Sequence, residues 1–342
     1  MQTWGNLLLY VLMWLSFAVV VVVALAIDFL AMRKQGAHKV SFKEALIWSV
    51  AWVALSFAFV GWLWWYLGGT SGDPAAELLA HTKALEFITG YLIEKTLAVD
   101  NIFVFLLVFT YFAIPLEFQK RVLMIGIMGA LALRAVMILL GAWLISEFHF
   151  VLYIFGLFLI YTGIQIWRSI GKEPDLEKSI ALKWVKKGLK YTPHFDGEKF
   201  FTWQNGKRVA TPLLAVIAVI GIVDVIFAVD SIPAIFAVTT DPFIVLSSNV
   251  FAILGLRAMY FLLADLHDRF HLLSYGLAIV LVFIGTKMLL IDIVKVPIVW
   301  SLSITAVILA GSVLLSLRIP QKGPAVSAYP FPPKEEPERT NT

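Results

Sequence analysis

Two pairs of acidic residues lie inside long apolar stretches of the chain. The segment "EKTLAVD" places Glu94 and Asp100 in one stretch, and "DVIFAVD" places Asp224 and Asp230 in another with the same spacing. An ionised side chain at the centre of a membrane helix costs roughly 2.5–3.5 kcal/mol, so such acids must pair, face water or bind an ion. Carboxylate oxygens are hard ligands, which Mg²⁺, Ca²⁺ and Mn²⁺ prefer. The four acids therefore predict a mid-membrane metal site.

Other polar residues in the apolar stretches could support this site. No cysteine is present, and the six histidines fall outside the apolar stretches, which disfavours zinc and copper. The four carboxylates less two arginines leave two negative charges, which one divalent cation would balance. The supporting residues are Asn101, Ser231, Asn249, Arg134, Arg257, Lys95 and Lys287, and Pro233 is a predicted helix kink.

Neither pair of acids can chelate an ion alone on a regular helix. Six residues separate the acids of a pair by about 120° around the helix and about 9 Å along it. Pro233 could kink its helix and bring Asp230 closer to Asp224. Alternatively, Asp100 and Asp230 could meet between two helices, with Glu94 and Asp224 beside them. A purely structural role, in which the acids pair with the arginines and lysines, also remains open.

Composition identifies the elements that must position these residues. Of 342 residues, 60% are hydrophobic and only 15% are charged, which is typical of a polytopic membrane protein. We predict an all-α fold in which residues 1–317 form a single transmembrane domain with nine transmembrane helices. The predicted spans are 4–30, 45–67, 84–112, 122–144, 150–167, 212–238, 246–266, 274–291 and 297–317.

The distribution of basic residues predicts the orientation of the chain. Most of the 27 lysines and arginines fall in alternate gaps between the spans and in the C-terminal tail. The positive-inside rule then places the N-terminus outside and the C-terminus in the cytoplasm. Residues 168–211 form the largest cytoplasmic loop, predicted to hold a basic amphipathic helix and an Asn205-Gly206 hairpin. The proline-rich tail, 318–342, is predicted to be disordered.

An internal repeat relates the two acid-bearing regions. The segment "LALRAVMILL" at 131–140 shares six of ten residues with "LGLRAMYFLL" at 254–263, and the acid pairs align with each other. The predicted repeats are about 84–167 and 212–291. Because their first spans enter the membrane from opposite sides, they are 3+3 inverted repeats, formed by spans 3–5 and 6–8. In transporters, such repeats place the substrate site near mid-membrane.

The predicted chemistry is transport rather than catalysis. Crowded carboxylates without a cation raise each other's pKa and take up protons, so metal entry must release those protons. Combined with alternating access, this exchange describes an antiporter. The expected partners are a divalent cation, protons and membrane lipid, with no nucleic acid and no organic cofactor. No nucleophile–base pair or cofactor motif is present, so we do not expect an enzyme.

Residues 224–263, together with "ITGYLIEKTLAVDNIFVF" at 88–105, strongly resemble the TerC family of integral membrane proteins, especially its alkali-induced members. The resemblance covers about residues 80–317. It implies a LysE-like transporter in the bacterial inner membrane that exports Mn²⁺ as its substrate. The acidic motif of the family falls here on Glu94, Asp100, Asp224 and Asp230.

Other functions remain open on the sequence alone. Some members of the family are implicated in the assembly of membrane proteins or in loading exported proteins with metal. The family name comes from tellurite resistance, and a transporter of another substrate, such as a cationic amino acid, is a further alternative. Oxygen ligands by themselves do not rank Mn²⁺ above Mg²⁺ or Ca²⁺, so only the resemblance favours manganese.

Overall fold

The computed structural model describes residues 2–35, 41–169, 180–192, 195–204, 206–264, 272–294 and 296–319. Within its helices, the side chains of Asp100 and Asp230 lie outside the description, as do those of a few other residues. The predicted disorder of the C-terminal tail concerns residues that, from 320 onwards, are also outside it. The statements below concern the described residues.

The described part of each predicted span is largely helical, and the span predicted over 246–266 is divided between two helices. The helices are α1 (Gln2–Gln35), α2 (Phe42–Tyr66), α3 (Pro74–Tyr111), α4 (Leu116–Glu147), α5 (Val151–Ser169), α6 (Ile180–Gly188), α7 (Pro212–Phe236), α8 (Pro242–Leu254), α9 (Leu256–Ala264), α10 (Leu273–Leu289) and α11 (Ile298–Arg318).

In the described part of the chain, seven helical stretches are long and apolar enough to cross a membrane, with α8 and α9 counted as one stretch. Helices α3 and α10 are not among the seven, because α3 carries three charged residues between 94 and 100 and α10 has only 17 residues. The predicted all-α polytopic membrane fold is confirmed. The count of nine spans stays a prediction.

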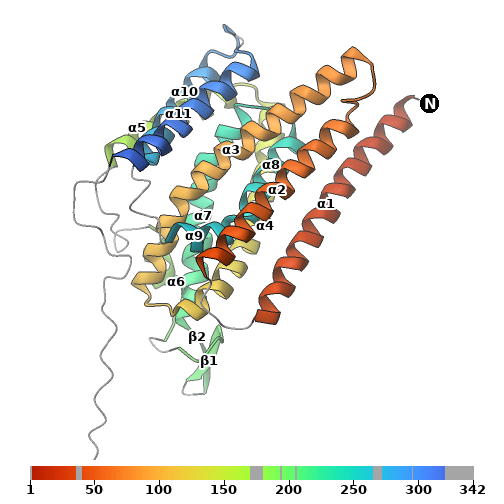
Figure 1. Ribbon diagram of the computed structural model, residues 1–342. Coiled ribbons are helices and arrows are strands. Elements are labelled where there is room, and N and C mark those ends of the chain that lie inside the picture. The colour runs from red at the N-terminus through yellow and green to blue at the C-terminus, as the bar shows by residue number, and fades with distance from the viewer. Residues whose placement is uncertain are drawn as a thin grey trace, which may run out of the picture.

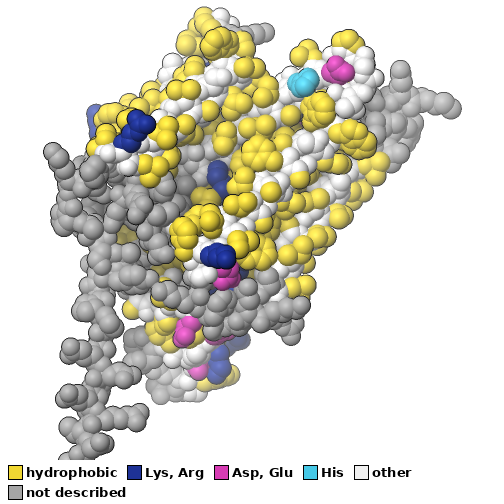
Figure 2. All heavy atoms as spheres, in the orientation of Figure 1, with side chains coloured by type: hydrophobic (Ala, Val, Ile, Leu, Met, Phe, Trp, Pro, Cys, Tyr) yellow, Lys and Arg dark blue, Asp and Glu magenta, His cyan; other side chains and the backbone are white. Residues whose placement is uncertain are grey.

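The helices form an elongated bundle. Figure 1 shows α1 along one edge and α5, α10 and α11 grouped at the other, while the hairpin and α6 lie at the end away from the N-terminus. In the centre of the bundle, α3 packs against α8 and α4 packs against α7. Hydrophobic side chains cover the long flank in Figure 2, and several charged side chains gather toward the hairpin end. This pattern is what a lipid-facing flank requires.

The contacts between α5 and α10 support an inverted repeat. A Cβ added at Gly285 would lie 2.6 Å from the carbonyl oxygen of Gly156, and one at Gly163 would lie 2.8 Å from that of Ala278. The residue numbers rise along one helix as they fall along the other, so the helices are antiparallel. In the repeat alignment, Gly163 corresponds to Gly285 and Gly156 to Ala278. If each residue is replaced by its counterpart in the other repeat, the Gly285–Gly156 contact becomes the Gly163–Ala278 contact, as a twofold axis between the repeats requires.

The long loop also folds as predicted where it is described. Strands β1 (Phe201–Gln204) and β2 (Lys207–Ala210) pair antiparallel, and Gly206 in the turn has a φ of 73°. Helix α6 buries Ala181, Leu182 and Val185, and it packs on α7. The basic helix is thus attached to the bundle. Asn205 of the predicted turn is outside the described residues.

The interruption of a central helix occurs at Gly255, where the sequence predicts one continuous span over 246–266. Helix α8 ends at Leu254 and α9 begins at Leu256. A Cβ at Gly255 would lie 2.8 Å from Lys95 Nζ and 3.1 Å from Trp52 Cβ, so a larger residue would require Lys95 and Trp52 to shift. By contrast, α7 continues through Pro233 to Phe236.

Candidate cation site

Arg134 joins two of the predicted acids at the centre of the bundle. It extends from the middle of α4, and its Nε and Nη2 donate to the two carboxylate oxygens of Asp224 on α7 at 3.0 and 2.8 Å. Its Nη1 donates to Glu94 Oε1 on α3 and lies 3.4 Å from Ser231 Oγ on α7. Helices of both predicted repeats therefore converge on one guanidinium group. We call Glu94, Arg134 and Asp224 the central cluster.

The central cluster is buried and contains two carboxyl groups beside one guanidinium group. The exposed fractions of Glu94, Arg134 and Asp224 are 0%, 2% and 4%. With both acids ionised, one guanidinium leaves one negative charge uncompensated. The second carboxylate oxygen of Glu94, Oε2, has no hydrogen-bond partner among the described residues. Such a group is costly to bury alone, so it can accept a proton or bind a cation.

A small cavity adjoins the central cluster. It has a volume of about 10 Å³ and is lined by all three cluster residues, by Ile127 and by Ile253 and Leu256 on either side of the helix break, among others. This is roughly the space that one water molecule needs.

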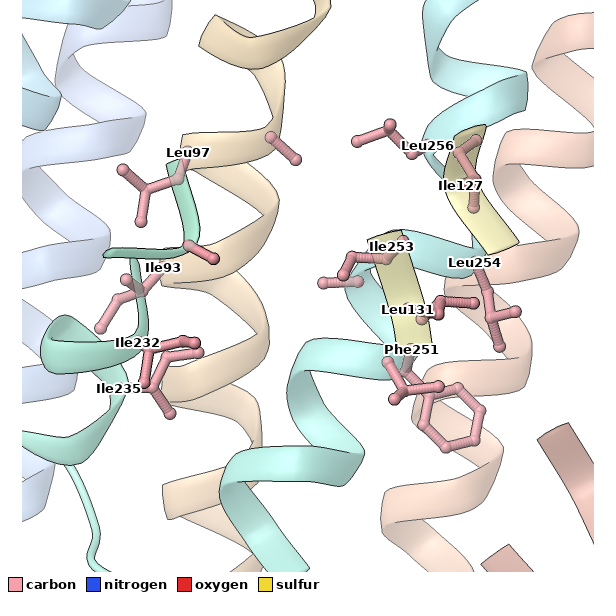
Figure 3. Close-up of a cluster of buried hydrophobic side chains, with 14 of the residues drawn as sticks. Ile93, Leu97, Ile127, Leu131, Ile232, Ile235, Phe251, Ile253, Leu254 and Leu256 are labelled. Carbon is pink, nitrogen blue, oxygen red and sulfur yellow. The ribbon is translucent and has the colours of Figure 1, made fainter. Parts of the chain in front are cut away.

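Apolar side chains enclose the central cluster. Figure 3 shows part of the buried apolar core, in which residues of α3 and α7 form one group and residues of α4, α8 and α9 form another. Of these, Ile127, Ile253 and Leu256 line the cavity at the central cluster. Their burial lowers the local dielectric constant and strengthens every charge interaction inside. The labelled residues are Ile93, Leu97, Ile127, Leu131, Ile232, Ile235, Phe251, Ile253, Leu254 and Leu256.

The structure brings together only part of the predicted site. Glu94 and Asp224 meet on Arg134, whereas the side chains of Asp100 and Asp230 lie outside the described part. Among described residues, no group of three or more histidine, aspartate or glutamate side chains is close enough to hold a metal. Whether the four acids converge is therefore still a prediction.

Two predicted neutral ligands are buried. Asn101 is 5% exposed on α3, directly after Asp100. Asn249 on α8 is fully buried, and neither polar atom of its amide has a partner in the described part. A buried amide with unused hydrogen-bonding capacity is expensive, so Asn249 remains a candidate ligand. Pro233, two residues beyond Ser231, lies in the last turn of α7.

The predicted lysines lie away from the central cluster. Lys95 donates from Nζ to the carbonyl oxygen of Ala252 at 3.1 Å, at the C-terminal end of α8. This contact satisfies a carbonyl that lacks a helical partner and places a cation at the negative end of the helix. Lys287 is half-buried on α10 and interacts electrostatically with Glu86 of α3. Lys95 thus supports the helix break.

Arg257, the repeat counterpart of Arg134, pairs with an acid that the sequence analysis missed. Its Nη2 donates to Asp28 on α1, and both residues are 7% exposed. Asp28 belongs to the predicted span 4–30, so the rule that charges at membrane depth need partners could have found it. Its position outside the repeats gave no reason to connect it with Arg257.

Comparison with known proteins places the chain in a family. The model of the integral membrane protein TerC family matches residues 79–323. Proteins named "Putative membrane-bound redox modulator Alx" from Shigella flexneri and Escherichia coli K12 are 51% identical over 305 residues, covering 89% of this chain and 94% of theirs. An uncharacterized membrane protein, STKORF319, from Myxococcus xanthus is 47% identical over 316 residues, covering 92% and 95%. No solved structure matches the chain. The chain therefore belongs to the TerC family of integral membrane proteins.

Proposed function

We propose that this protein exports divalent metal cations across the bacterial inner membrane, with Mn²⁺ as its preferred substrate, in exchange for protons. Its N-terminus lies in the periplasm and its C-terminus in the cytoplasm. The cation binds mid-membrane to Glu94, Asp100, Asp224 and Asp230, and the two repeats alternate its access to either side.

The observation that carries the proposal is the excess of carboxyl groups over basic groups in the central cluster. A structural ion pair would balance its charges, but two carboxylates share Arg134 here and Glu94 Oε2 has no described partner. Charged residues inside a membrane domain often mark an ion pathway. The cluster also joins α3, α4 and α7, which belong to both repeats, as expected for a site between inverted repeats.

Proton exchange follows from the same charge. In the absence of metal, a proton on Glu94 Oε2 would neutralise the cluster. A divalent cation that binds the carboxylates must release such protons, and their return restores the metal-free state. Arg134 holds the two carboxylates in position throughout, and its bidentate contact with Asp224 fixes their orientation.

The name of the Alx relatives suggests a second function, redox modulation. This chain contains no cysteine, so thiol–disulfide exchange would have to be carried out by another protein. Assembly of membrane proteins or metal loading of an exported protein without transport is a related alternative. A metal-flux measurement separates these functions from export.

Proteoliposomes containing a Mn²⁺-sensitive dye test the proposal. Wild-type protein should move Mn²⁺, and an imposed proton gradient should accelerate the movement. Asp224→Asn and Glu94→Gln should lower the flux by at least tenfold. Glu77→Gln is the matched control, because Glu77 is a half-buried acid in the first turn of the same helix as Glu94, well away from the central cluster along that helix. Equal fluxes in all four proteins would overturn the proposal.

Two further measurements define the substrate. Competition by Mg²⁺ and Ca²⁺ should be weaker than that by unlabelled Mn²⁺, and flux of lysine or arginine without metal flux would indicate the cationic amino acid alternative. Cells that lack the protein should accumulate Mn²⁺ under manganese load. If the Asp224→Asn variant returns the Mn²⁺ content of these cells to the wild-type level, the central cluster is not needed for export.

A further inference from the structure

A cluster of charged side chains joins α3 to the turn between α7 and α8. The Lys83 ammonium lies 3.0 Å from Glu86 Oε2 and 2.9 Å from Asp241 Oδ2. Glu86 Oε2 also accepts a hydrogen bond from the Thr239 hydroxyl at 2.7 Å, and Lys287 of α10 interacts electrostatically with Glu86. Two acids and two lysines therefore balance one another here. We call Lys83, Glu86 and Asp241 the Lys83 bridge.

The Lys83 bridge lies at the periplasmic end of the bundle in the predicted orientation. The gaps 68–83 and 239–245 between the predicted spans both face the periplasm in that orientation. The contact between Lys83 and Asp241 brings these two gaps together. The bridge therefore fastens the start of α8 to the outer part of α3.

Helices α3 and α8 run side by side from the bridge to the central cluster (Figure 1). Three contacts follow one another along the two helices, and they join Lys83 to Asp241, Gly90 to Ser248 and Lys95 to Ala252. The residue numbers rise together, so the helices are parallel. Glu94 of the central cluster lies eight residues, about 12 Å, beyond Glu86 on α3. The α3–α8 interface thus connects the bridge with the central cluster.

Polar residues lie on α8 between the bridge and the central cluster. Ser247, Ser248 and Asn249 are all fully buried. The Ser248 hydroxyl donates to the carbonyl oxygen of Ile244 at 2.7 Å, but neither polar atom of the Asn249 amide has a partner in the described part of the chain. Asn249 precedes by four residues Ile253, which lines the cavity at the central cluster. Residues four apart are neighbours on a helix surface, so the unused amide lies on the same side of α8 as that cavity.

The Lys83 bridge has the moderate strength that a gate requires. The side chains of Lys83, Glu86 and Asp241 are 21%, 14% and 28% exposed, so water can replace their contacts. Ion pairs that water reaches contribute little net stability, and they break at small cost. Asp241 also accepts a hydrogen bond from the Phe243 N–H at 3.0 Å, which keeps the start of α8 helical when the bridge breaks.

We propose that the outward route of the transported cation runs along the α3–α8 interface, with the Asn249 amide as an intermediate ligand and the Lys83 bridge as the outer gate. When the bridge breaks, the start of α8 separates from α3 and water reaches Asn249. The amide oxygen then supplies a hard ligand between the central cluster and the periplasm. The inference rests on the proposed function for the identity of the ion, whereas opening of the gate is measured without metal.

Thiol labelling of the full-length protein tests the gate. The chain contains no cysteine, so Asn249→Cys provides a single labelling site. A cationic, membrane-impermeant methanethiosulfonate reagent is added to spheroplasts, whose periplasmic side is open. Labelling should be slow while the bridge is intact and about fivefold faster when Lys83→Gln is added. Lys83→Arg keeps the charge and should keep the slow rate.

The controls separate opening of the gate from general loosening. Lys199→Gln is the matched control, because Lys199 also pairs with an acid three residues away but belongs to the cytoplasmic loop, and it should leave the rate unchanged. Thr305→Cys, at a buried position on α11, should label equally slowly with and without Lys83→Gln. Asp241→Asn keeps the cap of α8 and removes only its charge, so it should also accelerate labelling and decides the matter if Lys83→Gln does not fold.

Three results would overturn the proposal. They are equal labelling of Asn249→Cys with and without the bridge, an equal acceleration at Thr305→Cys, and an acceleration seen only in inside-out vesicles. The outcome is independent of the flux assay. If labelling responds as expected while proteoliposomes show no Mn²⁺ movement, the gate stands and the proposed function fails; Mn²⁺ movement without any response in labelling overturns the gate alone.

Discussion

Arg134 and Arg257 occupy equivalent positions in the two repeats but have different partners. Arg134 contacts Glu94 and Asp224, which come from α3 and α7 inside the repeated unit. Arg257 contacts Asp28, which comes from α1 outside it. One arginine therefore has more negative charge beside it than it can balance, whereas the other has an unused donor.

This difference shows how a symmetric sequence produces two unlike sites. The repeat places both arginines at comparable positions on their helices, but it does not determine what lies beside them. Helix α1 lies outside both repeats, and it brings a carboxylate to one arginine only. The break at Gly255 adds to the asymmetry, because α4 continues unbroken through the corresponding region.

Removing Arg134 should have the largest effect. Arg134→Gln leaves two buried carboxylates without their cation, which should lower the free energy of unfolding by about 3–5 kcal/mol. Unfolding in detergent, followed by circular dichroism, measures the loss. Adding Glu94→Gln and Asp224→Asn to this variant should restore most of the stability without restoring transport. If the triple variant is no more stable than Arg134→Gln, the loss does not come from the unpaired acids.

Removing Arg257 should have a smaller effect on stability. Arg257→Gln leaves a single carboxylate without its main partner, and the nearby Lys120 can partly replace the lost cation. We expect a loss of about 1–3 kcal/mol, measured as for Arg134. A loss equal to that of Arg134→Gln would show that the two arginines carry similar structural roles after all.

Alanine at Gly255, the glycine at the helix break, should destabilise the protein, whereas alanine at a helical glycine in open space should not. Gly255→Ala brings a Cβ to 3.1 Å from Trp52 Cβ, which cannot move like the end of a lysine, so it should cost about 1–3 kcal/mol. Gly221→Ala, at a helical glycine with open space around it, should instead stabilise α7 by about 0.5–1 kcal/mol. Thermal unfolding of the two variants measures the contrast, and equal effects would contradict the close approach at Gly255.

Removing the exposed ion pair between Asp196 and Lys199 should have the smallest effect. A hydrogen bond from the Thr202 hydroxyl and the nearby Lys199 ammonium hold the pKa of Asp196 below its ordinary value of 3.8. The folded state therefore gains stability from this carboxylate above that value and loses it as the pH falls through the lowered pKa. Hydrogen exchange of residues 195–211, corrected for intrinsic rates, should increase slightly below about pH 4. Asp196→Asn should remove that pH dependence.

The sequence predicts the helices well because their cause is local. Apolar length sets each span, and the turn residues at Gly206 form the expected hairpin. Helices α3 and α7, which carry the two aligned acid pairs, meet at the centre, where Glu94 and Asp224 share Arg134. The predicted meeting of Asp100 with Asp230 stays a prediction. These features depend on composition and periodicity, which one sequence contains.

The remaining features depend on tertiary contacts. Nothing local distinguishes Gly255 from other helical glycines, and only the approach of Lys95 and Trp52 explains the break. The partner of Arg257 likewise depends on how α1 packs against the repeats. The kink predicted at Pro233 stays a prediction; α7 continues past this residue, since a proline near a helix end removes few hydrogen bonds.

The crossing of α5 and α10 has a mechanical consequence. The paired close contacts at Gly156–Gly285 and Gly163–Ala278 surround the axis that exchanges the two halves. If one repeat rotates relative to the other about this contact, the contact itself moves least and the ends of the helices move furthest. A bulky side chain at Gly156 or Gly285 would push α5 and α10 apart and hinder this rotation, without any change to a charged residue.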